Sequence, residues 1–140
     1  MSESNETPWF ISNDPALVDV DAVHRMLQGS YWADGRSKDT IRESIANSIC
    51  FGVYLNADRR QIGFARVVTD KATFSWICDV IVDEGHRSKG IGKALMAAVM
   101  EHPYVHSTMN LLGTRDAHGL YEQFGFVRRE MMRRSTRTFG

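Results

Sequence analysis

Net charge is absent from this sequence, because its 17 Lys and Arg residues are balanced by 17 Asp and Glu residues. A neutral chain has no overall field that attracts nucleic acid or an anionic membrane. Long apolar runs are absent too, since none approaches the roughly 18 residues of a membrane-spanning helix. Residues 1–7 are polar and carry neither the basic patch nor the apolar core of a signal peptide. We therefore expect a cytoplasmic protein with no nucleic-acid partner and no membrane partner.

Cysteine and clustered metal ligands are also scarce. Cys50 and Cys78 are the two cysteines, and each lies in an apolar, strand-like run. This placement indicates buried, reduced thiols rather than a disulfide or a metal site. The five histidines are scattered, and no Cys and His group has zinc-site spacing. We expect no metal cofactor.

The chain has enough apolar residues for one sizeable core. Its 140 residues are 43% hydrophobic and 24% charged, which is typical of one ordinary globular domain. We predict a single domain over residues 1–140, with its core at about 9–129. Residues 130–140 are predicted to be a basic tail or arm, because Glu130 is the one acid near the arginines at 128, 129, 133, 134 and 137.

Apolar periodicity predicts alternating strands and helices, which indicates an α+β or mixed α/β fold. Two-residue and 3.6-residue periods mark the elements, and turn residues separate them. We expect strands at residues 9–12, 50–55, 62–68, 73–82 and 109–112 and from 126, and helices at 20–28, from about 38, at 90–101 and at 117–124. Pro103 is expected to stop the third helix, and Asp116 to cap the last.

The segment from residue 79 to 95 is the most informative. A strand-like run leads into a loop with Gly90 and Gly92, and an apolar helix follows. Glycine lacks a β-carbon, so its backbone N–H can approach a ligand closely, and the helix adds the positive end of its dipole. Arg87 and Lys89 place two cations beside the loop, which suits a diphosphate. The segment therefore predicts a phosphate-binding loop.

Two well-known phosphate loops do not match this segment. A nucleotide P-loop needs lysine and then Ser or Thr after its second glycine, whereas Lys89 precedes Gly90, and Lys93 is followed by Ala94. A Rossmann fingerprint needs a third small residue and an acid about 20 residues further on. Neither pattern is present.

The loop resembles motif A of the GNAT superfamily of N-acetyltransferases, written Gln/Arg-x-x-Gly-x-Gly/Ala. Residues 120–126, Leu-Tyr-Glu-Gln-Phe-Gly-Phe, resemble the family's motif B. The resemblance covers about residues 9–129. It implies a central mixed, mostly antiparallel sheet of about six or seven strands flanked by about four helices. The sheet is expected to splay at a slot for the pantetheine arm of acetyl-CoA, the cosubstrate.

The resemblance also assigns roles to residues. It implies that the diphosphate is bound by Arg87, Ser88, Lys89, Gly90, Ile91 and Gly92, and that the backbone of Val80, Ile81 and Val82 pairs with the pantetheine amides. Tyr121 matches the tyrosine that protonates the leaving thiolate. A phenol with a pKa near 10 is a reasonable donor to a thiolate whose conjugate acid lies near 8.5. The alternative for Tyr121 is a half-buried core aromatic.

The sequence departs from the family pattern where many members have a glutamate. Nine residues before Arg87 this chain has Cys78, and the neighbouring acid is Asp79. We predict that Asp79 acts through water as the base or binds the cationic substrate. A structural carboxylate that bonds to a turn or to Arg66 is the alternative.

A second departure is Thr114, seven residues before Tyr121, where the family often has asparagine. Threonine can still donate a hydrogen bond to a pantetheine carbonyl. Arg115 and His118 lie near the same helix start, and His118 is one turn before Tyr121. His118 is either a group that tunes or replaces the proton donor or a surface histidine.

Aromatic and charged residues suggest the acceptor site. Aromatic rings and carboxylates favour an amine cation, whereas Arg36 and Arg66 favour a substrate carboxylate and hence an amino acid or a peptide end. Core packing also explains some of the aromatics. The candidate substrate-binding residues are Tyr31, Trp32, Arg36, Phe74 and Asp79, with Asp70 and Trp76 nearby in the pattern.

Three functions stay open at this level. The first is an acetyl-CoA-dependent N-acetyltransferase that acetylates a primary amine of a small molecule or peptide by direct attack in a ternary complex. The second is a non-catalytic acyl-CoA binding or sensing module. The third is a nucleic-acid or partner-binding domain that uses the basic tail, which neutral overall charge disfavours. The resemblance further implies a homodimer, for which the arm after Arg129 is available.

Overall fold

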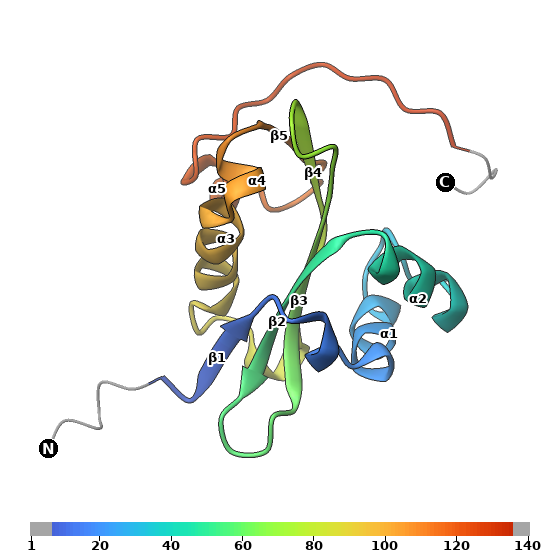
Figure 1. Ribbon diagram of the computed structural model, residues 1–140, viewed down its shortest axis with the longest axis vertical. Helices are drawn as coiled ribbons and strands as arrows, with labels where there is room; N and C mark the ends of the chain where they lie inside the picture. The colour runs from blue at the N-terminus through green and yellow to red at the C-terminus, as the bar shows by residue number, and fades with distance from the viewer. Residues whose placement is uncertain (1–6, 136–140) are drawn as a thin grey trace, which may run out of the picture.

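A five-stranded sheet carries the fold of this computed structural model, which describes residues 7–135 (Figure 1). The strands lie side by side in chain order. They are β1 (Trp9–Ser12), β2 (Ile49–Leu55), β3 (Gln61–Thr69), β4 (Phe74–Val82) and β5 (Met109–Leu111). The first four pair antiparallel and β5 pairs parallel to β4. The predicted mixed, mostly antiparallel sheet is confirmed.

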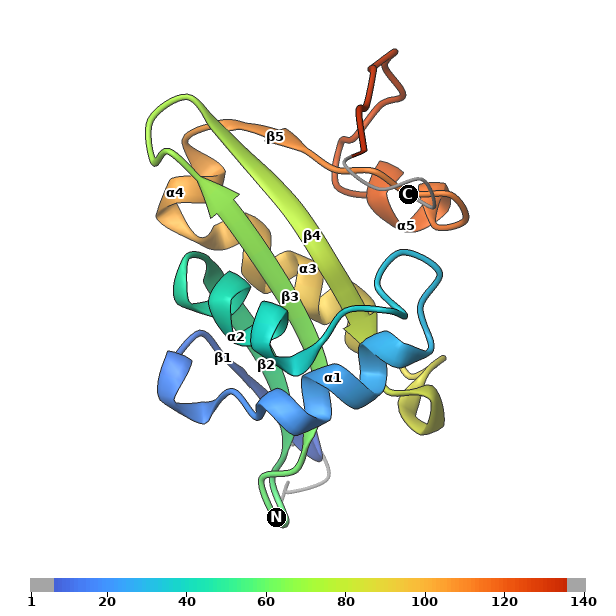
Figure 2. The same ribbon diagram turned by 90° about the vertical axis from the view of Figure 1, so that its right-hand side faces the viewer.

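Helices cover both faces of the sheet, as the edge-on view in Figure 1 shows. They are α1 (Val20–Gln28), α2 (Lys38–Ala46), α3 (Ile91–Glu101), α4 (Pro103–His106) and α5 (His118–Glu122), with short 3-10 turns at Pro15–Leu17 and Glu84–His86. The pair α1 and α2 lies on one face and α3 on the other (Figures 1 and 2). None of the helices in this described part of the chain is long and apolar enough to cross a bilayer.

Alternation along the strands divides the core into two clusters. Phe51 and Val53 face α3, while Cys50 faces α1 and α2. Helix α3 contributes Ile91 and Leu95, with Met96 and Val99, and each of these is at most 2% exposed. Because burial of apolar area is worth about 25 cal/mol per Å², the well-buried α3 face holds the helix firmly against the sheet.

The sheet splays between β4 and β5. The two strands pair over Phe74–Trp76 and Met109–Leu111 only, and beyond Trp76 strand β4 runs on to Val82 while the chain after Leu111 turns towards α5 (Figure 2). The pairing of β3 with β4 also shifts register between Phe64 and Arg66. This opening leaves the free edge of β4 beside the start of α3.

The register shift coincides with an unusual backbone at Asp79. Arg66 pairs with Cys78 and Phe64 with Ile81, so the single residue between the β3 partners faces two in β4, as in a β-bulge. Asp79 has a φ of 54°, in the left-handed region that costs a non-glycine residue about 1 kcal/mol or more. The surrounding contacts must therefore hold Asp79 in place.

Three predicted details of the fold are wrong. The strand expected from residue 126 does not form, so residues 7–135 contain five strands rather than six or seven, and five α-helices rather than about four. The charged run at residues 128–130 interrupts the two-residue alternation that a half-buried strand needs. Ala117, not Asp116, is the N-cap of α5, and it has no side-chain cap bond.

The proline prediction holds in part. Helix α3 ends at Glu101, and Pro103 opens the short α4, where its missing N–H is not needed. The described part of the basic tail, up to residue 135, has no regular secondary structure, and Arg137 lies outside the described residues.

Candidate active site

The glycine loop lies between the end of β4 and the start of α3. Gly90 is the N-cap of the 11-residue helix α3, has a φ of 80°, and has no side-chain cap bond. A β-carbon on Gly90 would meet no atom within 4 Å, and one on Gly92 would lie 3.9 Å from Val82 Cγ2. Ser88 also has a positive φ of 67°, and left-handed residues in such loops turn successive N–H groups towards one side. The loop therefore presents uncapped backbone donors to open space, as a diphosphate requires.

A cavity of about 490 Å³ opens beside this loop, and we call it the coenzyme cavity after the ligand that the sequence predicts for the loop. Its walls come from the end of β4, the glycine loop, the segment after α1 and the start of α5. The volume lies in the range of about 300–1,000 Å³ that is usual for ligand pockets. Of the predicted site residues, Tyr31, Trp32, Val80, Ile81, Val82, Arg87, Ser88, Gly90, Ile91, Gly92 and Tyr121 line it.

Tyr121 lies in the wall between two cavities. A second cavity of about 680 Å³ is lined by Trp76, the chain after β5 including Thr114, His118, and residues 124–131, and it also includes Tyr121. The Tyr121 side chain is 9% exposed, and its hydroxyl has no hydrogen-bond partner among the described residues 7–135. Burial, with smaller contributions from Tyr31 and Asp116, raises the pKa of Tyr121 to about 12. The hydroxyl is therefore protonated at neutral pH and can donate to a ligand.

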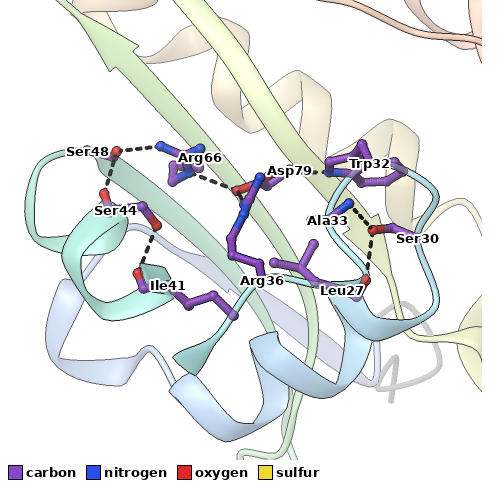
Figure 3. Close-up of polar contacts among 10 residues, drawn as sticks. All are labelled: Leu27, Ser30, Trp32, Ala33, Arg36, Ile41, Ser44, Ser48, Arg66 and Asp79. Atoms are coloured by element: carbon purple, nitrogen blue, oxygen red, sulfur yellow. Dashed lines mark hydrogen bonds and ion pairs between the residues drawn. The ribbon is translucent and has the colours of Figure 1, made fainter. Parts of the chain in front are cut away.

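The Asp79 carboxylate accepts hydrogen bonds from three side chains (Figure 3). Its Oδ2 accepts from Arg36 Nη1 at 2.8 Å and from Arg66 Nε at 2.8 Å, and its Oδ1 accepts from Trp32 Nε1 at 3.1 Å. The Asp79 side chain is 2% exposed. A buried carboxylate is costly unless it is paired, and the two guanidinium groups provide that pairing. We call these four residues the Asp79 cluster.

The α1–α2 loop, residues 29–37, is fastened at a second point. The Tyr31 hydroxyl accepts a hydrogen bond from the backbone N–H of Arg115 at 2.9 Å. The Arg115 guanidinium stacks on the Tyr31 ring at 3.7 Å from its centroid. The loop therefore bridges from β4, through Trp32, to the segment that precedes α5, and it spans one side of the coenzyme cavity.

Comparison with known proteins identifies this arrangement. A family model described as the acetyltransferase (GNAT) domain matches residues 46–128. The crystal structure of a GNAT-family protein of Xanthomonas campestris is 38% identical, covers 94% of this chain and 96% of its own, and has a TM-score of 0.86. The chain belongs to the GNAT acetyltransferase family.

Other proteins match this GNAT protein at lower sequence identity. A curated protein of Gibberella zeae, named a putative acetyltransferase, is 28% identical over 111 residues, and the match covers 66% of this chain and 63% of that protein. The structure of glucosamine-6-phosphate N-acetyltransferase from Arabidopsis thaliana, 15% identical with a TM-score of 0.70, covers 93% of this chain and 98% of its own. At that identity the likeness shows the GNAT fold alone.

Several predicted site residues lie apart from the coenzyme cavity of the GNAT domain. Lys89 is exposed and does not line it. Thr114 lines the second cavity, where its Oγ1 accepts from Ala117 N at 3.0 Å. Phe74 is at the far end of β4 from Asp79. Asp70 lies in the turn before Phe74, where hydrogen bonds led by the one from the Thr73 hydroxyl hold its pKa well below the usual range.

The two cysteines are free thiols, as predicted. Cys50 is buried and Cys78 is half-buried. Burial raises the pKa of Cys50 to about 12 and that of Cys78 to about 11, so both stay protonated at neutral pH. Within residues 7–135, no group of three His, Cys, Asp or Glu side chains is arranged to hold a metal ion.

The bond between Asp79 and Arg66 agrees with the alternative given for Asp79, a structural carboxylate, but the sequence did not indicate the other two partners of Asp79. Trp32 and Arg36 precede Asp79 by 47 and 43 residues. No local pattern joins positions so far apart in one sequence. The roles of Asp79 as a base or as a ligand for a cationic substrate stay predictions. Its three occupied acceptor contacts favour instead a role in positioning the loop.

Proposed function

We propose that this GNAT protein transfers an acetyl group from acetyl-CoA to a primary amine of a small molecule or peptide, by direct attack in a ternary complex. The observation that carries the proposal is the coenzyme cavity, in which the uncapped start of α3, the end of β4 and the Tyr121 ring line one space. The family's fold implies the use of acetyl-CoA. Bound acetyl-CoA supplies an acyl group already activated as a thioester.

The loop and strand provide the binding groups. Backbone N–H groups at Gly90, Ile91 and Gly92 donate to the diphosphate, and the dipole of α3 adds favourable charge. Arg87 and Lys89 supply cations at the rim. Beyond Trp76, β4 pairs with no strand on its β5 side within residues 7–135, so backbone groups at Val80–Val82 are available to the pantetheine amides.

Tyr121 supplies the proton in the transfer step. The lone pair of the acceptor nitrogen forms a bond to the carbonyl carbon, the carbon–sulfur bond breaks, and the sulfur takes the Tyr121 proton. Water takes the proton that the nitrogen loses, and solvent returns a proton to Tyr121. The raised pKa of about 12 keeps the Tyr121 hydroxyl protonated between turnovers at neutral pH. A sensor module needs no donor at this point, so the free Tyr121 hydroxyl favours an enzyme.

Calorimetric binding of acetyl-CoA tests the coenzyme site. In the Gly90→Asp/Gly92→Asp variant, bulk and negative charge fill the diphosphate position, and the Kd is expected to rise by on the order of 100-fold or more. Gly35→Asp is the control, because Gly35 is exposed and lines neither cavity. Equal binding by the wild type and the double variant would contradict the site, and absence of binding by the wild type would remove the proposal.

A further inference from the structure

The Asp79 cluster has one positive charge too many. Arg36 and Arg66 both pair with Asp79, and no other acid pairs with either arginine in the described part of the chain. Cys78 lies beside Arg66 in the sheet but is an uncharged thiol, since burial raises its pKa to about 11. Two guanidinium groups therefore share one carboxylate, and the cluster keeps a net charge of about +1 at neutral pH.

Both arginines keep hydrogen-bond donors that no other residue among 7–135 uses. Asp79 engages Nη1 of Arg36 and Nε of Arg66, and the hydroxyl of Ser48 engages Nη1 of Arg66 at 3.1 Å. A guanidinium carries five N–H donors, so the Nη2 groups of both arginines remain available. The arginine side chains are 23% and 15% exposed, whereas Asp79 is 2% exposed. The carboxylate is thus buried, whereas the side chains of both arginines reach solvent in part.

The cluster adjoins the coenzyme cavity through Trp32. The indole donates to Asp79 and also lines the cavity in which Tyr121 lies. Trp32 and Tyr31 are 41% and 43% exposed, and Trp32 is shared by the Asp79 cluster and the lining of the coenzyme cavity. Arg36 and Arg66 line neither cavity themselves, so a small molecule with an anionic group on them would have to pass Trp32 to bring its other end to Tyr121.

We propose that Arg36 and Arg66 form a carboxylate-binding subsite, so that the acceptor is an amine that also carries a carboxylate, as an amino acid or a short peptide does. This inference rests on the proposed acetyl transfer and names its substrate class. Two guanidinium groups held in place by Asp79 bind a carboxylate by charge-assisted hydrogen bonds with little loss of side-chain freedom. A purely cationic acceptor such as a polyamine meets the excess positive charge, and Asp79 is already occupied by three donors.

The first experiment compares acceptors that differ only in the carboxylate. Thiol release from acetyl-CoA is measured with the proteinogenic L-amino acids, with their C-terminal amides, and with the decarboxylated amines. Glycyl dipeptides and their amides distinguish a free amino acid from a peptide as the source of the carboxylate. For the best acceptor, we expect kcat/KM to exceed that of its amide by on the order of 10- to 100-fold. Equal rates with the amide and the acid, or rates highest with the decarboxylated amines, would overturn the inference.

The second experiment removes the charge from the subsite. Arg36→Gln is expected to raise KM for the carboxylated acceptor by on the order of 10-fold and to abolish the preference over the amide. Arg36→Lys, which keeps the charge, should retain part of that preference. Arg42→Gln is the matched control, because Arg42 pairs with the exposed Asp39 on α2. Calorimetric Kd values for acetyl-CoA should be the same in all four proteins.

Binding without turnover separates this inference from the proposed function. With CoA present, the best carboxylated acceptor should raise the melting temperature of the wild type, and the Arg36→Gln variant should lose that shift. Failure of the wild type to bind acetyl-CoA sinks the proposed function. Normal acetyl-CoA binding, with turnover that ignores the carboxylate or with no turnover of any acceptor in the panel, contradicts the carboxylate subsite alone.

Discussion

The two walls of the coenzyme cavity differ in the groups that they present, which are backbone groups on one wall and side chains on the other. On the α3 side, the glycine loop and the free edge of β4 present backbone groups. The side chains there matter mainly by being small or absent. On the α1–α2 side, Tyr31 and Trp32 contribute their side chains, and Trp32 is linked through Asp79 to Arg36, which itself lines neither cavity. Backbone donors suit a ligand that is the same in every member of a family, whereas side chains can change with the acceptor. We therefore propose that the first wall, called the coenzyme wall, binds the coenzyme, and that the second, called the specificity wall, selects the acceptor.

The largest expected effect comes from Tyr121, which lines both cavities. In Tyr121→Phe the ring stays and the proton donor is lost, so kcat should fall by about 100- to 10,000-fold while the Kd for acetyl-CoA stays within a few-fold. Rapid kinetics of thiol release together with calorimetry check this split. Normal kcat in the variant would mean that Tyr121 is a packing residue.

The pH profile of the wild type sharpens the same point. Because burial raises the pKa of Tyr121 to about 12, the active, protonated form persists across the neutral and mildly alkaline range. We expect no loss of kcat from this group below about pH 11. A descending limb near pH 10 that vanishes in Tyr121→Phe would contradict the shifted pKa.

A stability effect comes next, at Asp79. Asp79→Asn keeps the shape and tolerates the left-handed φ of 54°, but it leaves two arginines close together without their anion. We expect a loss of about 2 kcal/mol in the free energy of unfolding, below the value for a fully buried pair because the arginines reach solvent. Urea unfolding checks the value. Asp39→Asn, which removes an exposed partner of Arg42, should cost less than about 1 kcal/mol.

The smallest expected effect is at Trp32. Trp32→Phe keeps an aromatic wall but removes the 3.1 Å bond to Asp79, which should cost about 1 kcal/mol in unfolding free energy. KM for the acceptor should rise more than KM for acetyl-CoA, since Trp32 belongs to the specificity wall. Steady-state kinetics with each substrate varied in turn would measure both. Equal changes in the two constants would erase the proposed distinction between the walls.

The sequence predicts the coenzyme wall much better than the specificity wall. Residues 87–92 form a local pattern, and their loop opens a helix as expected, because glycine spacing and helix start are determined within a few residues. Strands β1 to β4 were predicted within one or two residues from apolar alternation. Tyr121, which was predicted from its own local motif, lines the coenzyme cavity, and its role as proton donor stays a prediction.

The specificity wall depends on contacts between residues far apart in the sequence, which no local pattern encodes. The Tyr31 hydroxyl meets Arg115 across 84 residues, and two of the three partners of Asp79, Arg36 and Trp32, are 43 and 47 residues away. The positive φ of Asp79 is another product of tertiary contacts, since aspartate in a strand gives no local signal for it. The missing last strand has a similar origin, because pairing depends on an edge partner as well as on composition.

The length of the α1–α2 loop is constrained by what it holds. Trp32 and Arg36 both end on the same carboxylate, and Tyr31 is stacked under Arg115, so one added or deleted residue between Trp32 and Arg36 would pull one of them out of reach. Substitutions in this loop can therefore keep the anchoring, whereas insertions would break it. Directed evolution of acceptor choice should therefore conserve the spacing and vary Asp34 and Gly35, whose side-chain positions are exposed.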